Sequence, residues 1–247
     1  MSVPGLQGRE GMGGAEARGD PGGRVLGLLA KQPRVGQVKT RLAAESSVEW
    51  AAKVAHAVLL DTISRLSAVA ARRVLAFSPA AAEAFFADLA AGRFALVQQV
   101  AGDLGRRMQS FLAGEFAAGA GQVLLLGADS PTVPLALIDQ AFQELQRADV
   151  VLGPATDGGY YLVGCAGRVP PIFDGPAWGS PSVLADTVAR LGTDWRLAML
   201  PPWYDVDTLA DWCVLKGHLV AMRRAGIDPG LPHVEQLIAQ EGASAKA

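Results

Sequence analysis

The chain has 247 residues, half of them hydrophobic, and a formal net charge of −2. That length suits one large α/β domain or two small ones, and the apolar fraction is enough to build a buried core. The near-neutral charge argues against the broad basic surface that grips nucleic acid, so we expect no nucleic-acid partner.

Several features predict a soluble protein of a reducing compartment. Residues 1–23 are rich in glycine and lack the apolar run of a signal peptide, so we expect a disordered tail there and a second short one at 241–247. No apolar run approaches the ~20 residues that span a bilayer. Cys165 and Cys213 have no Cys or His neighbour at metal-ligand spacing. These features predict a cytoplasmic protein without a membrane partner.

Short apolar runs alternate with longer amphipathic ones along the chain. The short runs predict strands at 24–30, 73–78, 94–98, 122–127, 149–153, 160–164 and 195–200. The amphipathic segments predict helices at 45–66, 80–91, 105–118, 134–147, 180–191 and 208–224, with a last short helix after 226–232. Some strands, such as 123–126, are apolar on both faces. The alternation predicts a single domain over residues 24–240, a three-layer α/β/α sandwich with a mostly parallel sheet.

The loop after the first predicted strand carries four cations and no carboxylate. Because ligands bind at the carboxyl ends of strands in open α/β sheets, this loop is well placed to hold a polyphosphate. Gly36 permits a tight backbone path, and Thr40 could cap a following helix. The alternative is a solvated basic loop, because the segment is not a glycine-rich Walker loop. The four cations are Lys31, Arg34, Lys39 and Arg41.

Two acidic loops follow later predicted strands. Asp129 comes directly after the most hydrophobic strand, where it could hold Mg²⁺, or it could cap a turn before Pro131. Asp205 and Asp207 flank Val206, and we expect that only one of the two carboxylates can reach a metal. We expect Asp207 to do so, with Asp205 turned aside. The alternative is that Asp207 caps the next helix.

The loop around Asp157 combines a carboxylate with two glycines. Gly158 and Gly159 let the backbone approach a ligand closely, although Asp-Gly is also an ordinary hairpin signal. Tyr160 and Tyr161 follow, and strand alternation predicts that one ring faces the core and the other the cleft.

Taken together in chain order, these motifs resemble a bacterial family of GT-A-fold glycosyltransferases, some linked with arsenosugar biosynthesis. The resemblance covers roughly residues 24–215. Related proteins are the phospholactate guanylyltransferases, through residues 39–42, and the sugar-activating cytidylyltransferases, through Asp207 and Thr208. This chain departs from the family pattern at Ser130, where a Cys is usual. The motifs are Lys31-x-Pro33-x-x-Gly36-x-x-Lys39-Thr40-Arg41-Leu42, Asp103-Leu104-Gly105-x-Arg107-Met108, Gly127-x-Asp129-x-Pro131, Asp157-Gly158-Gly159-Tyr160-Tyr161-Leu162-x-Gly164, Trp178-Gly179-Ser180 and Asp205-Val206-Asp207-Thr208.

The resemblance implies a set of site residues. Asp129 and Asp207 would hold Mg²⁺ or Mn²⁺, and Asp157 and Lys39 would be catalytic. Arg106 and Arg107 have either a helix-surface role or a contact with phosphate or acceptor. The acceptor side would be lined by Asp157, Gly158, Gly159, Tyr160 and Trp178. The nucleotide and its phosphates would be bound by Lys31, Pro33, Gly36, Lys39, Thr40, Arg41 and Asp103.

We therefore expect a metal-dependent transferase with two substrates, a nucleotide or nucleotide-sugar donor and a small-molecule acceptor. Glycosyl transfer is the preferred chemistry. One alternative is nucleotidyl transfer from a nucleoside triphosphate to a phosphorylated small molecule, and the four-cation loop favours it. Another is a non-catalytic nucleotide-binding protein, although the metal carboxylates are retained. The sequence leaves open whether the protein forms a homodimer.

Overall fold

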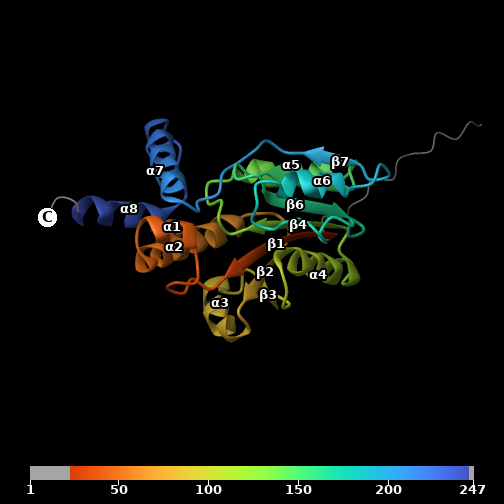
Figure 1. Ribbon diagram of the computed structural model, residues 1–247, viewed down its shortest axis with the longest axis horizontal. Coiled ribbons are helices and arrows are strands. Elements are labelled where there is room, and N and C mark those ends of the chain that lie inside the picture. The colour runs from red at the N-terminus through yellow and green to blue at the C-terminus, as the bar shows by residue number, and fades with distance from the viewer. Residues whose placement is uncertain (1–22, 245–247) are drawn as a thin grey trace, which may run out of the picture.

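The computed structural model describes residues 23–244, and its centre is one seven-stranded sheet (Figure 1). The strand order is β3-β2-β1-β4-β6-β5-β7. Within the described residues, β6 is the one strand that runs antiparallel to its neighbours. All seven predicted strands are confirmed, as is the mostly parallel sheet. The strands are β1 (Arg24–Lys31), β2 (Arg72–Ser78), β3 (Ala95–Gln98), β4 (Gln122–Gly127), β5 (Val150–Pro154), β6 (Tyr160–Ala166) and β7 (Leu197–Met199).

Helices cover both faces of the sheet, which confirms the three-layer sandwich. α2, α3 and α5 pack on one face, and α4 and α6 pack on the other. Among the described residues, no helix is both long and apolar enough to cross a membrane. The helices are α1 (Thr40–Glu45), α2 (Val48–Leu66), α3 (Glu83–Ala90) after the 3₁₀ turn η2 (Ala80–Ala82), α4 (Leu104–Ala117), α5 (Leu135–Glu144), α6 (Val183–Ala189), α7 (Leu209–Arg224) and α8 (Pro232–Ser244).

The first strand shows why the sheet needs cover on both sides. Leu26 and Leu28 are buried against α2 and α5 on one face, and Val25 is buried in the core on the other. A β-carbon at Gly27 would lie 2.5 Å from the Phe111 ring, so glycine here lets α4 approach β1 closely. This close packing holds the carboxyl end of β1 in place.

The predicted helix at 45–66 is shorter than expected at its start. Residues 40–45 form the separate helix α1, and α2 begins at Val48. The reason is the Ser47 side chain, which accepts a hydrogen bond from Trp50 N at 3.1 Å and so caps α2. The predicted helix at 180–191 is likewise shorter, at Val183–Ala189.

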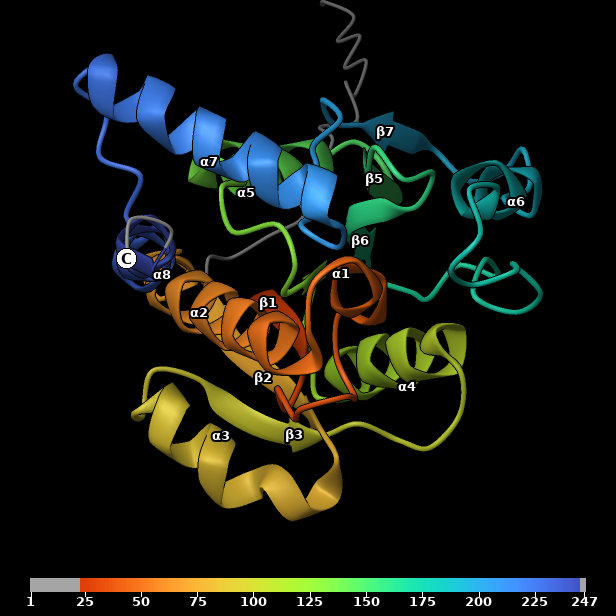
Figure 2. The same cartoon turned by 60° about the vertical axis from the view of Figure 1, so that its left-hand side comes forward.

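Helices α1, α2, α7 and α8 build a third apolar cluster at one end of the molecule (Figure 2). Leu42, Val54, Trp212 and Val234 are fully buried in it. The Trp50 and Trp212 rings meet edge to face with their centroids 5.8 Å apart. The cluster anchors α1, and with it the basic loop that precedes α1.

The two predicted tails fare differently. Residues 1–22 lie outside the described residues, whereas the carbonyl of Gly23 accepts from Gly121 N at 2.9 Å. The tail predicted at 241–247 is wrong for residues 241–244, which form the last turn of α8. The Glu241 carboxylate accepts from Trp212 Nε1 at 3.1 Å and from Lys216 Nζ at 3.2 Å, which fixes this turn against α7.

Asp61 on α2 holds the start of α8. Its buried carboxylate accepts from His233 N at 3.2 Å and from Val234 N at 2.9 Å. These are two of the four amide groups that a helix start leaves without an intrahelical partner. The contact therefore satisfies one buried donor, Val234 N, and one part-buried donor, His233 N.

Replacing Asp61 with alanine should lower the free energy of unfolding by about 1–3 kcal/mol, because two backbone donors, one of them buried, lose their acceptor. Urea denaturation would measure the loss. Asp228→Ala is the matched control: this exposed carboxylate accepts from Gly230 N and pairs with Arg223, and its loss should cost less than about 1 kcal/mol. Equal losses in the two variants would show that α8 is not held by Asp61.

Candidate active site

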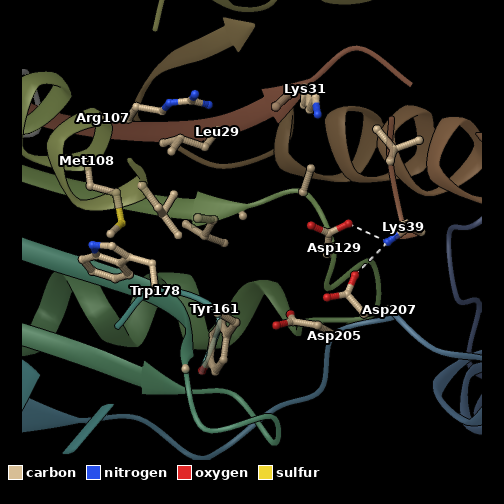
Figure 3. A pocket seen from close by; sticks show the side chains of 18 of the residues that line it. Leu29, Lys31, Lys39, Arg107, Met108, Asp129, Tyr161, Trp178, Asp205 and Asp207 are labelled. Carbon is tan, nitrogen blue, oxygen red and sulfur yellow. Dashed lines mark hydrogen bonds and ion pairs between the residues drawn. The ribbon is translucent and has the colours of Figure 1, made fainter. Parts of the chain in front are cut away.

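A cleft of about 490 Å³ opens at the edge of the sheet where β1, β4 and β5 end and where β6 begins. Because β6 is antiparallel, its first residues reach the same edge as the last residues of its parallel neighbours. Figure 3 shows the cleft with its acidic and apolar ends. The predicted site residues that line it are Lys31, Pro33, Lys39, Arg41, Asp129, Asp157, Gly159, Tyr160, Trp178 and Asp207.

Lys39 lies at the centre of the acidic end. Its Nζ is 2.6 Å from Asp129 Oδ1, 2.6 Å from the carbonyl oxygen of Val206 and 3.4 Å from Asp207 Oδ1 (Figure 3). Its side chain is 3% exposed, while that of Asp129 is 51% exposed. The two predicted metal carboxylates thus converge on one point, and the Lys39 ammonium stands there.

The backbone that delivers Lys39 is unusual. Gly36 turns the loop with φ 74°, and Lys39 itself has φ 44° and ψ 51° as the residue before α1. A left-handed conformation costs a non-glycine residue about 1–3 kcal/mol and persists where its surroundings hold it. The predicted cap at Thr40 is wrong, because Thr40 is the first residue of α1 and Lys39 takes the N-cap position without a side-chain cap.

Arg41 links the two acidic loops across the mouth of the cleft. Its Nη2 is 2.8 Å from Asp207 Oδ2 and 3.8 Å from Asp157 Oδ2. Both Arg41 and Asp157 are largely exposed, so these pairs contribute little to stability. The ion pair with Asp157 does place Arg41, a predicted phosphate-binding residue, next to a predicted acceptor-binding residue.

The pKa values of these groups reflect burial and mutual charge. Burial opposes the charge on Lys39, yet Asp129 and Asp207 outweigh it and raise the pKa of the ammonium. Burial and the charge of Asp129 raise the pKa of Asp207, although Lys39 and Arg41 partly offset them. Lys39 therefore carries its charge at neutral pH.

Asp205 was expected to turn aside from the metal pair, and in Figure 3 its carboxylate points away from Lys39. Its carboxylate lines the cleft and accepts a hydrogen bond from Ser130 Oγ. Burial raises its pKa to about 7, helped by the charges of Asp129, Asp207 and Asp157 and opposed by the bond from Ser130. The residue that turns inward is Val206, which is fully buried among α1, α2 and α7. Strand alternation places residues two apart on the same side, which is what the structure shows: Val206 points inward and both carboxylates line the cleft.

The loop at Asp157 is both a hairpin and a wall of the cleft. Asp157 Oδ1 accepts from Gly159 N at 3.0 Å, and Ala155 N donates to Gly159 O at 3.0 Å, which closes the turn between β5 and β6. Gly158 has φ 93°, and a β-carbon there would lie 2.2 Å from Pro181 O. The hairpin alternative therefore holds, and Asp157 faces the cleft as well.

The apolar end of the cleft centres on Trp178 and Met108 (Figure 3). The Tyr160 and Trp178 rings meet edge to face at 6.3 Å. Tyr160 packs in the core on the α4 side of the sheet and Tyr161 on the α2 side, which confirms that the two rings face apart. Both nevertheless line the cleft, so the expectation that one ring would face only the core is wrong. A β-carbon at Gly105 would lie 2.0 Å from Phe173 O and 2.7 Å from the Trp178 ring, so glycine lets Trp178 lie against the start of α4.

Gln99 lines the cleft although it was not predicted to do so, and Arg107 lines it as one of its two predicted alternatives allowed. Gln99 Nε2 donates to the carbonyl oxygens of Ala30, at 3.1 Å, and Ala76, at 2.6 Å, and so ties the ends of β1 and β2. Arg107 Nη1 donates to Gln99 Oε1 at 3.4 Å. Arg107 belongs to the motif that begins at Asp103, and this motif was the sequence feature that pointed to it as a site residue. Nothing in the pattern singled out Gln99.

Four predicted site residues do not line the cleft. Asp103 caps α4 by accepting from Arg106 N at 2.8 Å. Gly36 and Thr40 are exposed on the basic loop and α1, and Gly158 packs against Pro181. Their contributions here are to the backbone path of the loops that carry the lining residues.

A divalent cation fits the pair Asp129 and Asp207. The described residues contain no group of three or more His, Cys, Asp or Glu side chains placed to hold a metal ion. Mg²⁺ commonly takes only one or two carboxylates and completes its shell with phosphate oxygens and water. Oxygens of both carboxylates already surround one cation, the Lys39 ammonium, so the donor set suits such an ion.

Comparison with known proteins identifies the family. The family described as "Uncharacterized protein conserved in bacteria (DUF2064)" matches residues 60–180. A solved structure from Desulfovibrio desulfuricans G20, named "putative nucleotide-diphospho-sugar transferase", is 31% identical, with a TM-score of 0.75 over 89% of this chain and 98% of that one. This chain belongs to the DUF2064 family. The DUF2064 match includes Asp129 and Asp157, while the basic loop and Asp207 lie outside it.

More distant structures share the fold of this DUF2064 protein. The 4-diphosphocytidyl-2C-methyl-D-erythritol synthase of Anaerococcus prevotii DSM 20548 is 12% identical, with a TM-score of 0.51 over 81% of this chain and 99% of that one. A cytidylyltransferase of Leptospira borgpetersenii serovar Hardjo-bovis (strain JB197) is 13% identical, with a TM-score of 0.52 over 91% and 96%. No curated protein matches the chain. The family resemblance and the fold type that the motifs implied are confirmed.

Gly105→Ala should destabilise the DUF2064 protein by about 1–3 kcal/mol and shift Trp178, because the added methyl meets a backbone oxygen and the indole ring. Gly114→Ala on the same helix is the matched control: its β-carbon meets nothing within 4 Å, so it should stabilise by up to about 1 kcal/mol. Urea denaturation and tryptophan emission would measure both. A Gly105→Ala protein with wild-type stability and emission would contradict the packing described here.

Proposed function

We propose that this protein is a divalent-metal-dependent transferase that moves a sugar from a nucleotide-sugar donor to a small-molecule acceptor. The observation that carries the proposal is the convergence of Asp129 and Asp207 on one point beside the basic loop after β1. The DUF2064 family and the name of the 31% identical structure add support. The donor's diphosphate would lie between the metal pair and the cations Lys31, Lys39 and Arg41.

The proposed role of each residue follows from its place in the cleft. Asp129 and Asp207 would hold Mg²⁺ or Mn²⁺, which when bound neutralises charge on the departing diphosphate. Lys31 and Arg41 would bind phosphate oxygens and orient the donor. Gly159, Tyr160 and Trp178 would form the acceptor wall, with Trp178 offering a flat apolar surface.

Asp157 is the group proposed to accept the proton. The acceptor hydroxyl oxygen would form the new bond to the anomeric carbon as the bond from that carbon to the diphosphate oxygen breaks. The hydroxyl proton would pass to the Asp157 carboxylate, which lines the cleft and is well exposed. The departing nucleoside diphosphate would carry negative charge, which the cations of the basic loop would stabilise.

Nucleotidyl transfer is the second candidate, and the basic loop favours it. In that reaction a phosphate oxygen of the acceptor attacks the α-phosphorus of a nucleoside triphosphate and pyrophosphate leaves. Four cations in one loop suit a triphosphate. Against this, Lys39 and Arg41 are already paired with carboxylates, and Lys31 Nζ donates to Gln37 O at 2.7 Å. In the ligand-free protein the carboxylates therefore balance part of the loop's charge, which suits a diphosphate.

Asp129→Asn should abolish Mg²⁺-dependent binding of the donor, because the variant loses one of two metal carboxylates. Calorimetric titration with nucleotide-sugars and nucleoside triphosphates, each with and without Mg²⁺, would measure it. Asp139→Asn, on the exposed side of α5, is the matched control and should titrate like the wild type. Unchanged titration of the Asp129 variant would rule out this metal site.

The same titrations separate the two chemistries. Glycosyl transfer predicts that nucleotide-sugars bind at least as tightly as triphosphates. Triphosphate binding without nucleotide-sugar binding, together with pyrophosphate release when a phosphorylated acceptor is added, would replace glycosyl transfer by nucleotidyl transfer.

A further inference from the structure

We propose that Lys39 is a built-in cation that keeps the place of the divalent metal in the ligand-free protein, so that metal and Lys39 exclude each other at Asp129 and Asp207. This inference rests on the metal site of the proposed function. It adds that the Lys39 ammonium blocks the metal site in the ligand-free protein, and that displacing this ammonium makes it available to bind phosphate.

The first argument is the coordination of the ammonium. A lysine ammonium has three N–H donors, and three protein oxygens surround this one, at 2.6 Å, 2.6 Å and 3.4 Å. They belong to Asp129, Val206 and Asp207. In this arrangement no donor is left for a phosphate oxygen. A phosphate-binding role for Lys39 therefore requires that its side chain leave this position.

The second argument is space and charge. A divalent ion held by both Asp129 and Asp207 would need the space between their carboxylates, which Lys39 Nζ now fills at 2.6 Å and 3.4 Å from their oxygens. The Lys39 side chain is 3% exposed, so the protein encloses it closely. Two cations cannot occupy that volume together, because their repulsion is strong at such separations. Metal entry must displace Lys39.

The third argument is the backbone around Lys39, which is suited to a change of position. Lys39 lies in the left-handed region at φ 44°. The residues before it form an exposed loop without regular structure, with Val35 56% exposed at its turn. Displacing the side chain would let this residue leave a conformation that its present contacts hold. Figure 3 shows Lys39 reaching into the cleft between the two carboxylates.

The consequence is coupling between metal and nucleotide. A metal ion that binds without nucleotide must displace the three contacts of the Lys39 ammonium. It provides no new partner for the ammonium that it frees. A bound polyphosphate would provide that partner, so each ligand should strengthen binding of the other. Metal binding by the ligand-free protein should accordingly be weak.

The test measures Mn²⁺ binding in the absence of nucleotide. The electron paramagnetic resonance signal of free Mn²⁺ reports how much of the ion remains unbound. Lys39→Gln keeps the side-chain length approximately and removes the charge, so it should bind Mn²⁺ at least tenfold more tightly than the wild type. Lys216→Gln, whose ammonium pairs with Glu241 on α8, is the matched control and should bind like the wild type. Thermal melting of each variant would verify that it folds.

A second measurement uses the wild type alone. Amine acetylation read by mass spectrometry should modify Lys39 slowly without metal and faster once Mn²⁺ is added, with Lys216 as the internal reference. This readout remains if the Lys39 variant does not fold.

The outcomes distinguish this inference from the function on which it rests. Equal or weaker Mn²⁺ binding by Lys39→Gln, or Lys39 acetylation that Mn²⁺ leaves unchanged, overturns the exclusion of metal by Lys39 and leaves the metal site standing. Absence of Mn²⁺ binding in every variant overturns both. Tighter binding by Lys39→Gln supports the inference whichever group the enzyme transfers.

Discussion

The contact of the Lys39 ammonium with the oxygens of Asp129, Val206 and Asp207 joins three distant parts of the chain. Asp129 is 90 residues from Lys39 in sequence, and Val206 is 167 residues away. It ties the loop after β1 to the loop after β4 and to the segment that leads into α7. The side chain is enclosed, so the ion pair is less screened than a surface pair would be. The cleft takes its acidic end from this one cluster.

The supporting structure around this cluster is built to hold loop ends in place. Gly27 lets α4 lie close to β1, and Gln99 ties the ends of β1 and β2. The backbone N–H of Val206 donates to Asp129 O at 3.0 Å, while its side chain is buried under α7. Asp129, on the loop after β4, and Asp207, on the segment before α7, are thus held by this backbone hydrogen bond, and a more exposed loop carries the cations. Such a division suits a site in which cations follow a ligand in and carboxylates stay fixed.

The antiparallel strand β6 decides what faces the acidic cluster. Because β6 runs against its neighbours, the hairpin at Asp157 and the ring of Tyr160 reach the cleft edge instead of the opposite end of the sheet. Trp178 completes this side by lying against Gly105. The cleft therefore has a charged end, where we propose that a metal and phosphates bind, and an apolar end that suits a flat or aliphatic group. That asymmetry matches a reaction with two unlike substrates.

The sequence pattern predicted the strands, the mostly parallel sheet and the charged residues Lys31, Lys39, Arg41, Asp129, Asp157 and Asp207 that line the cleft. These follow from local signals: apolar runs of strand length, and charged or glycine-rich loops at their ends. It did not determine the break between α1 and α2 or the extent of α8, since a Ser47 cap and the Glu241 contacts decide those. Nor did it show that Asp205 stays in the cleft, that Gln99 lines it, or that Lys39 stands between the two carboxylates. Those facts depend on how segments 69 to 168 residues apart in the chain meet, and no local pattern records the distance between them.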